Sequence, residues 1–429
     1  MREPMRSGKR RKLFSLVWSL KFLLANFLVT NPSSAEVYYE INELEGLRKE
    51  KETQATAINN RSSVVGFSKD EEGNVFALLW EGKKTIELGV SEGESLSQED
   101  SASKRSIAFA FGINEKNQIV GGIAVGGSWP IVPFFWEDNE FYTIPTLLMG
   151  GMAYDINNNM QIVGYSEFAF FIYIQYATLW EMAEDKTIKR VIDLCVEDQN
   201  ENSFDEIDEL IREYNSEAYA INNKGKVVGR LFTYLAEEPL SYGFFWENGT
   251  ITPLDSLGGE QSLANDINDN DIIVGEAQTK EGKWHAFMWQ SGEMIDLGTL
   301  RGEESSAQAI NNLNQIVGSS TSADGTRQAV LWENGRIFNL NSLIPPGLNV
   351  ILETAVDIND KGDIVCNGKN AKGEKRAFLL RRIVEFPPPS QGKEEWVIIK
   401  EVADKKEIIN RVGEDENGNP DESLSLIHI

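Results

Sequence analysis

The sequence predicts an all-β fold, because a pattern of four short apolar runs recurs seven times with no helical period of useful length between the copies. The copies lie 43 to 65 residues apart, and Gly, Asn and charged residues bound each run. Four antiparallel strands per repeat are typical of one blade of a β-propeller. We therefore expect a seven-bladed β-propeller of four-stranded antiparallel blades, with its ring closed by an N-terminal strand.

We label the four apolar runs of a repeat A to D, in chain order. Run A ends in Ile-Asn and run B is an IVG-like segment, as in AYAINNKGKVVG at 218–229. The intervening Asn and Gly suit a tight turn, so we interpret this stretch as an A–B hairpin. The asparagine that ends run A recurs as Asn59, Asn114, Asn157, Asn222, Asn268, Asn311 and Asn359.

Run C carries a tryptophan at one equivalent position in six repeats, and run D resembles MIDLG at 294–298. A position that nearly every blade shares is expected to pack blade against blade rather than to bind sugar. These residues are Trp80, Trp136, Trp180, Trp246, Trp289 and Trp332.

The seventh repeat lacks run D, while VYYEINEL at 37–44 stands alone before the first run A. Ile41 and Leu44 are spaced like the apolar residues of run D. The N-terminal segment is therefore predicted to pair with the last run C, which removes the free edge of an open array.

The first 35 residues have the layout of a secretory signal peptide: a basic cluster at 9–12, an apolar run at 13–29 and small residues at 33–35. An uncleaved membrane anchor is the alternative.

Removing residues 1–35 takes away seven basic residues and one acidic residue, leaving 34 basic against 66 acidic. That balance argues against a nucleic-acid partner. We expect a secreted, extracellular or periplasmic monomer with no membrane span in the mature chain.

We expect the repeats to fill residues 36–384, and residues 385–429 to form a proline-rich linker and a tail. A strand and a short helix are predicted within 395–423. The final LSLIHI matches the translation of a widely used sequencing adapter, so the end is expected to be truncated or partly artefactual.

The two cysteines, Cys195 and Cys366, are expected to be small buried residues, with one disulfide as the alternative.

The linked motifs resemble the bacterial extracellular HAF-repeat proteins. HAFMW at 285–289, IDLGTL at 295–300 and LDSLGGEQSLANDIN at 254–268 carry the resemblance, and looser copies cover residues 37–381. This resemblance implies secretion and a β-propeller-like repeat scaffold, and it implies no reaction.

The A–B and C–D turns are short, whereas the length variation falls on the B–C and D–A connections. In a propeller these two sets lie on opposite faces, and function concentrates in variable loops on a rigid scaffold. We predict that the B–C and D–A face binds a glycan or a protein partner. The candidate ligand-binding residues are Trp129, Phe170, Tyr173, Tyr234 and Trp284. An amphipathic helix is also predicted at 203–214.

The Asp and Asn residues near run A resemble the alternating oxygen ligands of calcium loops. In five repeats the third ligand position holds Arg, Lys or Leu, none of which can coordinate a cation. We expect no cofactor and keep calcium in the third and fifth repeats as an alternative. Its candidate ligands are Asp155, Asn157, Asn159, Asp266, Asn268 and Asn270.

No motif of serine hydrolases, zinc enzymes or P-loop proteins occurs. His285 is interpreted as an ordinary strand residue. The sequence favours a binding or scaffold propeller, and the alternative is a polysaccharide hydrolase or lyase that uses paired carboxylates.

Overall fold

A computed structural model describes residues 36–48, 50–89, 107–124, 130–169, 173–195, 215–233, 240–385, 397–402, 405–410 and 426–428. The chain divides into two compact units, of which Tyr39–Arg382 is the larger and contains the repeats. The signal peptide expected at 1–35 and the helix expected at 203–214 lie outside the described residues.

Each repeat forms antiparallel strands that pair in the order A, B, C, D. Repeats one and two share a sheet, because Val75 in β4 pairs in parallel with Ile107 in β6. In order, the strands of repeats one to six are β2 (Glu50–Ile58), β3 (Val64–Asp70), β4 (Val75–Glu81), β5 (Lys84–Glu87); β6 (Ile107–Ile113), β7 (Ile119–Ala124), β8 (Ile131–Glu137), β9 (Glu140–Thr143); β10 (Gly150–Ile156), β11 (Gln161–Ala169), β12 (Tyr173–Met182), β13 (Ile188–Asp193); β14 (Asn215–Ile221), β15 (Val227–Phe232), β16 (Ser241–Glu247), β17 (Thr250–Pro253); β18 (Gly258–Ile267), β19 (Ile273–Thr279), β20 (Trp284–Gln290), β21 (Glu293–Asp296); and β22 (Arg301–Ile310), β23 (Ile316–Ser322), β24 (Arg327–Glu333), β25 (Arg336–Asn339).

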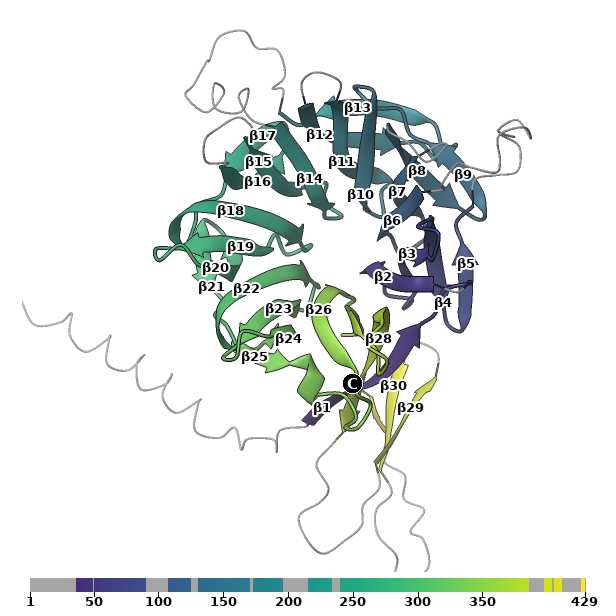
Figure 1. The fold of residues 1–429 in the computed structure, drawn as a ribbon, viewed down its shortest axis with the longest axis vertical. Coiled ribbons are helices and arrows are strands. Elements are labelled where there is room, and N and C mark those ends of the chain that lie inside the picture. Colours follow the sequence, from purple (N-terminus) through teal and green to yellow (C-terminus); the bar gives the residue numbers. More distant parts are fainter. Residues whose placement is uncertain are drawn as a thin grey trace, which may run out of the picture. The chain divides into compact units, whose positions relative to one another are not determined.

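The last repeat contributes three strands, β26 (Ile351–Ile358), β27 (Ile364–Lys369) and β28 (Lys375–Glu385), after the short 3-10 helix η2 (Leu340–Ser342). The N-terminal β1 (Glu36–Leu44) lies beside β28, so the sheet runs β1-β28-β27-β26. Within the larger unit the sheets stand around a common centre, with the A strands innermost (Figure 1). Each A strand contacts the A strands of its neighbours, and β2 also contacts β26. The fold is an all-β propeller.

A β-bulge interrupts every A strand at the same place. In β14 the pairing with β15 passes from Ala218 to Ala220 and skips Tyr219. Because a bulge leaves one residue out of the ladder, it re-aims that side chain. The skipped residues are Thr56, Phe111, Tyr154, Tyr219, Asn265, Gln308 and Val356.

The apolar core is a series of clusters that each join two successive repeats. Trp180 of the third repeat is fully buried and packs with Val120 and Phe135 of the second. Its indole N–H donates to the carbonyl of Pro145 at 2.7 Å. The other run-C tryptophans lie in equivalent clusters. The prediction that these tryptophans pack blade against blade is confirmed.

Both cysteines are free thiols, so the alternative of a disulfide is wrong for this structure. Burial raises the pKa of Cys195 to about 12, and Cys366 is fully buried. Thiols in such surroundings stay protonated and unreactive.

The smaller unit contains the antiparallel strands β29 (Val397–Val402), β30 (Lys405–Asn410) and β31 (Leu426–His428). The expected short helix is wrong where β30 lies. Ile408 stands opposite Ile399 in the ladder, and β-branched residues favour extended backbone.

Candidate functional site

The A–B turns are built around the asparagine that ends each A strand. In the fourth repeat, Asn222 Oδ1 accepts hydrogen bonds from the backbone N–H groups of Lys224 at 3.1 Å and Lys226 at 3.0 Å. Gly225 has a φ of 78°, a left-handed conformation that glycine adopts without strain. This confirms the interpretation of the stretch as a hairpin turn.

The same asparagines also link the repeats. Asn222 Nδ2 donates to the carbonyl of Asn268 in the next repeat at 3.1 Å. Equivalent bonds of 2.9–3.1 Å follow from repeat to repeat, and Asn359 donates to Asn59 at 3.0 Å. We call this closed cycle the asparagine ring; its members are Asn59, Asn114, Asn157, Asn222, Asn268, Asn311 and Asn359.

A second cycle uses the residue that follows each of these asparagines. The backbone N–H of Asn223 donates to Asp269 Oδ1 at 2.8 Å. Seven such bonds of 2.7–3.0 Å run around the turns and close between Asp360 and Asn60. We call this cycle the outer polar ring; its members are Asn60, Glu115, Asn158, Asn223, Asp269, Asn312 and Asp360.

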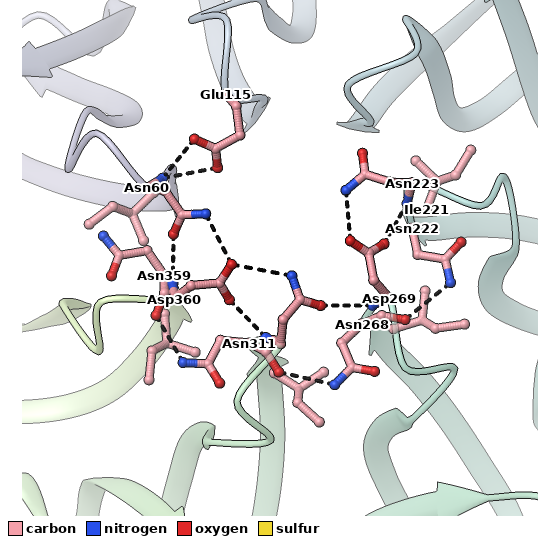
Figure 2. A pocket seen from close by; sticks show the side chains of 15 residues that line it. Asn60, Glu115, Ile221, Asn222, Asn223, Asn268, Asp269, Asn311, Asn359 and Asp360 are labelled. Carbon is pink, nitrogen blue, oxygen red and sulfur yellow. Dashed lines mark hydrogen bonds between the residues drawn. The ribbon is translucent and has the colours of Figure 1, made fainter. Parts of the chain in front are cut away.

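Members of both rings, together with the isoleucines that precede some of them, line a cavity of about 150 Å³ among the A–B turns (Figure 2). Figure 2 shows the side chains bonded to one another; Asp360, for example, accepts from Asn60 Nδ2 at 3.0 Å. A volume of this size is well below the roughly 300–1,000 Å³ of ordinary ligand pockets. The cavity therefore suits a structural role better than recognition of a large ligand.

Three half-buried aspartates, Asp155, Asp266 and Asp357, lie two residues before the ring asparagines of the third, fifth and seventh repeats. Asp266 Oδ1 accepts from Ile267 N at 2.7 Å, and Oδ2 accepts from Ile310 N of the next repeat at 2.8 Å. Asp155 and Asp357 bridge to the following repeat in the same way. Each carboxylate thus joins two repeats through backbone hydrogen bonds.

Four of the six candidate calcium ligands, Asp155, Asn157, Asp266 and Asn268, already use side-chain oxygens to accept backbone N–H groups. The Oδ1 atoms of Asn157 and Asn268 each accept two backbone N–H groups. The Nδ2 atoms of Asn159 and Asn270 donate to carbonyls of the next repeat at 2.9 and 3.0 Å. In the part of the chain that the structure describes, no group of three or more His, Cys, Asp or Glu could hold a metal ion.

These aspartates predict a pH dependence of stability. Burial raises the pKa of Asp266 from 3.8 to about 7. The hydrogen bond from Ile310 N–H acts in the opposite direction, and repulsion from Asp155 adds to the increase. Between these values the folded protein binds more protons than the unfolded chain, so this group's contribution to stability falls as the pH rises from about 4 to about 7. Loss of hydration, together with repulsion from Asp266 and Asp155, also raises the pKa of Asp357.

We expect Asp266→Ala to reduce this dependence, measured as the difference in Tm between pH 5 and pH 8. Alanine is the matched replacement, because Ala57, Ala220 and Ala309 occupy the equivalent position in other repeats. A variant that lost as much stability as the wild type over this range would contradict the assignment.

Most of the ligand-binding residues predicted from sequence lie outside the described residues, namely Trp129, Phe170 and Tyr234. Tyr173 is described only as the first residue of β12. Trp284 begins β20, where it is half-buried and paired with Gln278. The prediction that these five residues bind a ligand therefore stays a prediction.

A larger cavity, of about 520 Å³, is lined in part by Lys283 and His285, the two residues that flank Trp284 in the chain. Its lining comes from the D–A connection before β18, the B–C turn after β19, the strands β20 and β21, and β22. The lining residues are Leu257, Thr279, Lys280, Glu281, Lys283, His285, Asp296 and Glu303. This volume falls within the range of ordinary ligand pockets.

A histidine–aspartate hydrogen bond and an ion pair organise the wall of this cavity. His285 Nδ1 lies 2.9 Å from Asp296 Oδ2, which orients the imidazole ring. Lys283 Nζ contacts Glu303 Oε2. We call the cavity the His285 pocket. The sequence interpretation of His285 as an ordinary strand residue did not indicate its contact with Asp296, although only the fifth repeat has histidine at the start of run C.

No helix among the described residues is long and apolar enough to cross a bilayer. A search of curated proteins found no match to the sequence. One family model, "Protein of unknown function (DUF3466)", matches residues 146–293, which span most of the third to fifth repeats and less than half of the chain.

Among solved structures, the chain is similar to the β-propeller domain of the Trilobed protease from Pyrococcus furiosus, with 10% identity, a TM-score of 0.47, and 79% of this chain and 99% of that chain covered. YCF48 bound to D1 peptide is 11% identical with a TM-score of 0.44, covering 83% and 96%. A sialidase from Trypanosoma rangeli is 10% identical with a TM-score of 0.37, covering 80% and 59%. At these values the similarities carry no argument about a ligand or an activity of this chain.

Proposed function

We propose that the chain is an exported binding or scaffold propeller that recognises a glycan or a protein partner through the face of the B–C and D–A connections. The observation that supports this most directly is the His285 pocket. It is large enough for a ligand, and a B–C turn and a D–A connection contribute to it. Its lysines, imidazole and carboxylates supply both donors and acceptors, which suits the hydroxyl groups of a glycan.

We further propose that the seven repeats are the blades of one closed ring and that β1 is the outermost strand of the seventh. Trp180 and Trp332 donate to a carbonyl that follows the last strand of the preceding repeat, 35 residues earlier. Trp80 donates to the carbonyl of Glu45, also 35 residues earlier and just after β1. The N-terminal strand therefore has the same relation to Trp80 as an outermost strand has to its neighbour.

The catalytic alternative is a polysaccharide hydrolase or lyase, and the His285–Asp296 pair is the observation that favours it. When Nδ1–H donates to Asp296, Nε2 is left as a proton acceptor. Among the residues that line the pocket, Thr279 offers the only hydroxyl group, and its oxygen accepts from Lys283 N at 3.3 Å. This pattern supports binding more strongly than covalent catalysis.

We expect His285→Ala to weaken binding of a captured glycan about tenfold, equivalent to about 1.4 kcal/mol. The screen is a glycan array, followed by titration calorimetry, and it includes Trp129→Ala and Trp284→Ala. Gln328→Ala is the matched control, because Gln328 and Asn339 form the equivalent pair in the sixth repeat.

Equal affinity of His285→Ala and the wild type would exclude the His285 pocket as the binding site. Turnover of a polysaccharide panel by the wild type, abolished in His285→Ala, would instead establish the catalytic alternative.

A further inference from the structure

The residue that the β-bulge re-aims differs around the ring. It is aromatic in the second, third and fourth repeats and an amide in the fifth and sixth. The two remaining repeats have Thr56 and Val356 there. All seven side chains are half-buried, although the alanine before each of them is buried. Because the A strands are innermost, we infer that these side chains meet solvent on the side of the ring axis.

The aromatic side chains form a continuous row. Ring centroids are 5.9 Å apart between Phe109 and Phe111, 5.4 Å between Phe111 and Tyr154, and 5.7 Å between Tyr154 and Tyr219. Phe67 extends the row into the first repeat, 5.0 Å from Phe109. All these spacings lie within the range of attractive ring contacts. We call these five residues the aromatic row.

Packing alone does not require aromatic rings at the bulge. Thr56 and Val356 occupy the same position in neighbouring repeats, and their A strands keep the same bulge and the same asparagine turn. The fold therefore accepts a small side chain there. Three successive aromatic residues that stay half-exposed are better explained by a ligand whose apolar face they cover.

Amides occupy the bulge in the next two repeats. Asn265 Nδ2 donates to Ala307 O at 2.8 Å, and Gln308 Nε2 donates to Ser306 Oγ at 2.7 Å. Among the described residues, neither side-chain oxygen accepts a hydrogen bond. Both can therefore accept from a hydroxyl group. The cation beside the row, Arg230, is paired with a carboxylate, because its Nε donates to Glu217 at 2.9 Å.

We propose that the axial side of the inner strands binds a neutral glycan, whose sugar rings stack on the aromatic row and whose hydroxyl groups bond to Asn265 and Gln308. The C–H faces of a sugar ring are apolar and its edge is polar, so a glycan matches an aromatic row beside amides. Asp155, Asp266 and Asp357 lie next to bulge residues in the chain and offer no positive charge to an acidic sugar. This inference rests on the glycan part of the proposed function and assigns a site distinct from the His285 pocket.

The test uses the full chain and titrates it by calorimetry with a neutral cello-hexasaccharide and with an oligogalacturonate of the same length. Tyr219→Gln and Tyr154→Val replace each ring with the residue of another repeat, so they suit the bulge. We expect each variant to bind the neutral hexasaccharide about tenfold more weakly than the wild type. Tyr154→Phe keeps the ring and is expected to bind within about twofold. Thermal unfolding reports whether each variant is folded.

Gln328→Ala lies at neither site and is the control that should bind the hexasaccharide like the wild type. Loss of binding in Tyr219→Gln, with Gln328→Ala unaffected, would support the aromatic row as the site. Loss of binding in His285→Ala alone would overturn this inference and leave the proposed function standing. Absence of hexasaccharide binding, or preference for the galacturonate, would overturn the inference as well. If Tyr154→Val and Tyr219→Gln fail to fold, an unchanged affinity in Gln308→Ala, at the amide side, would count against it.

Discussion

Deletion of residues 36–48 is expected to lower the Tm of the propeller by about 10 °C or more. The deletion removes Tyr39 and Leu44, which are 1% and 6% exposed, and each such side chain contributes about 1.5–3 kcal/mol through burial. It also removes the carbonyl of Glu45, which accepts from Trp80 Nε1 at 2.7 Å and from Thr85 Oγ1 at 3.1 Å. The edge of β28 would then be exposed to water and to other chains.

Scanning calorimetry of the shortened chain would measure this effect, with a chain that lacks only residues 1–35 as the control. A point substitution refines the test. Tyr39→Ala is expected to cost about 3–5 kcal/mol, whereas Tyr38→Ala, at a side chain that is 37% exposed, should cost far less. An unchanged Tm after the deletion would show that β1 does not close the ring.

The repeats could be predicted from the sequence because their signals are local. Run A, the turn asparagine and the run-C tryptophan lie within about 30 residues of one another in each repeat, and each keeps a recognisable residue type. The tryptophan could be assigned to packing because it occupies one equivalent position in six repeats. The structure agrees, since each tryptophan packs against the preceding repeat.

The links between repeats could not be predicted in the same way. Asn222 bonds to Asn268, which is 46 residues away, and nothing local to either turn indicates the partner. The sequence explained the turn through Asn222 Oδ1 but did not indicate that Nδ2 reaches the next repeat. The cavity at the turns is likewise a product of the ring, since residues from several repeats line it.

The exposure of the bulge residue could have been inferred from the sequence. The position between Ala and the last residues of run A holds Thr, Phe, Tyr, Asn, Gln or Val in the seven repeats. A position that faces the core of every repeat would keep one chemical type, as the alanine before it does. Such variation beside constant residues indicates a side chain that leaves the core.

Asn222→Ala is expected to lower the free energy of unfolding by about 2–4 kcal/mol. Asn222 is 3% exposed, and its loss leaves the N–H groups of Lys224 and Lys226 without their acceptor. It also removes one of the two donors to the carbonyl of Asn268, the other being the N–H of Asp271. Each buried polar group left unsatisfied costs about 1–3 kcal/mol, and relaxation of the turn offsets part of that sum. Urea unfolding followed by far-ultraviolet circular dichroism would measure it.

Asn223→Ala is the matched control, because the neighbouring side chain belongs to the outer polar ring and is exposed. It is expected to cost less than about 1 kcal/mol, since water replaces its partners. Asn222→Asp separates the two roles of the amide: Oδ1 still closes the turn, but an oxygen replaces the donor to Asn268, so stability should fall although the turn is kept.

The shape of the transition then tests what the asparagine ring does. If the ring couples the repeats, Asn222→Ala unfolds in one transition at lower urea concentration, with the m-value of the wild type. If each turn stabilises only its own repeat, the fourth and fifth repeats unfold before the rest, as in arrays whose units interact only with their neighbours. Equal losses in Asn222→Ala and Asn223→Ala would exclude a special contribution of the ring.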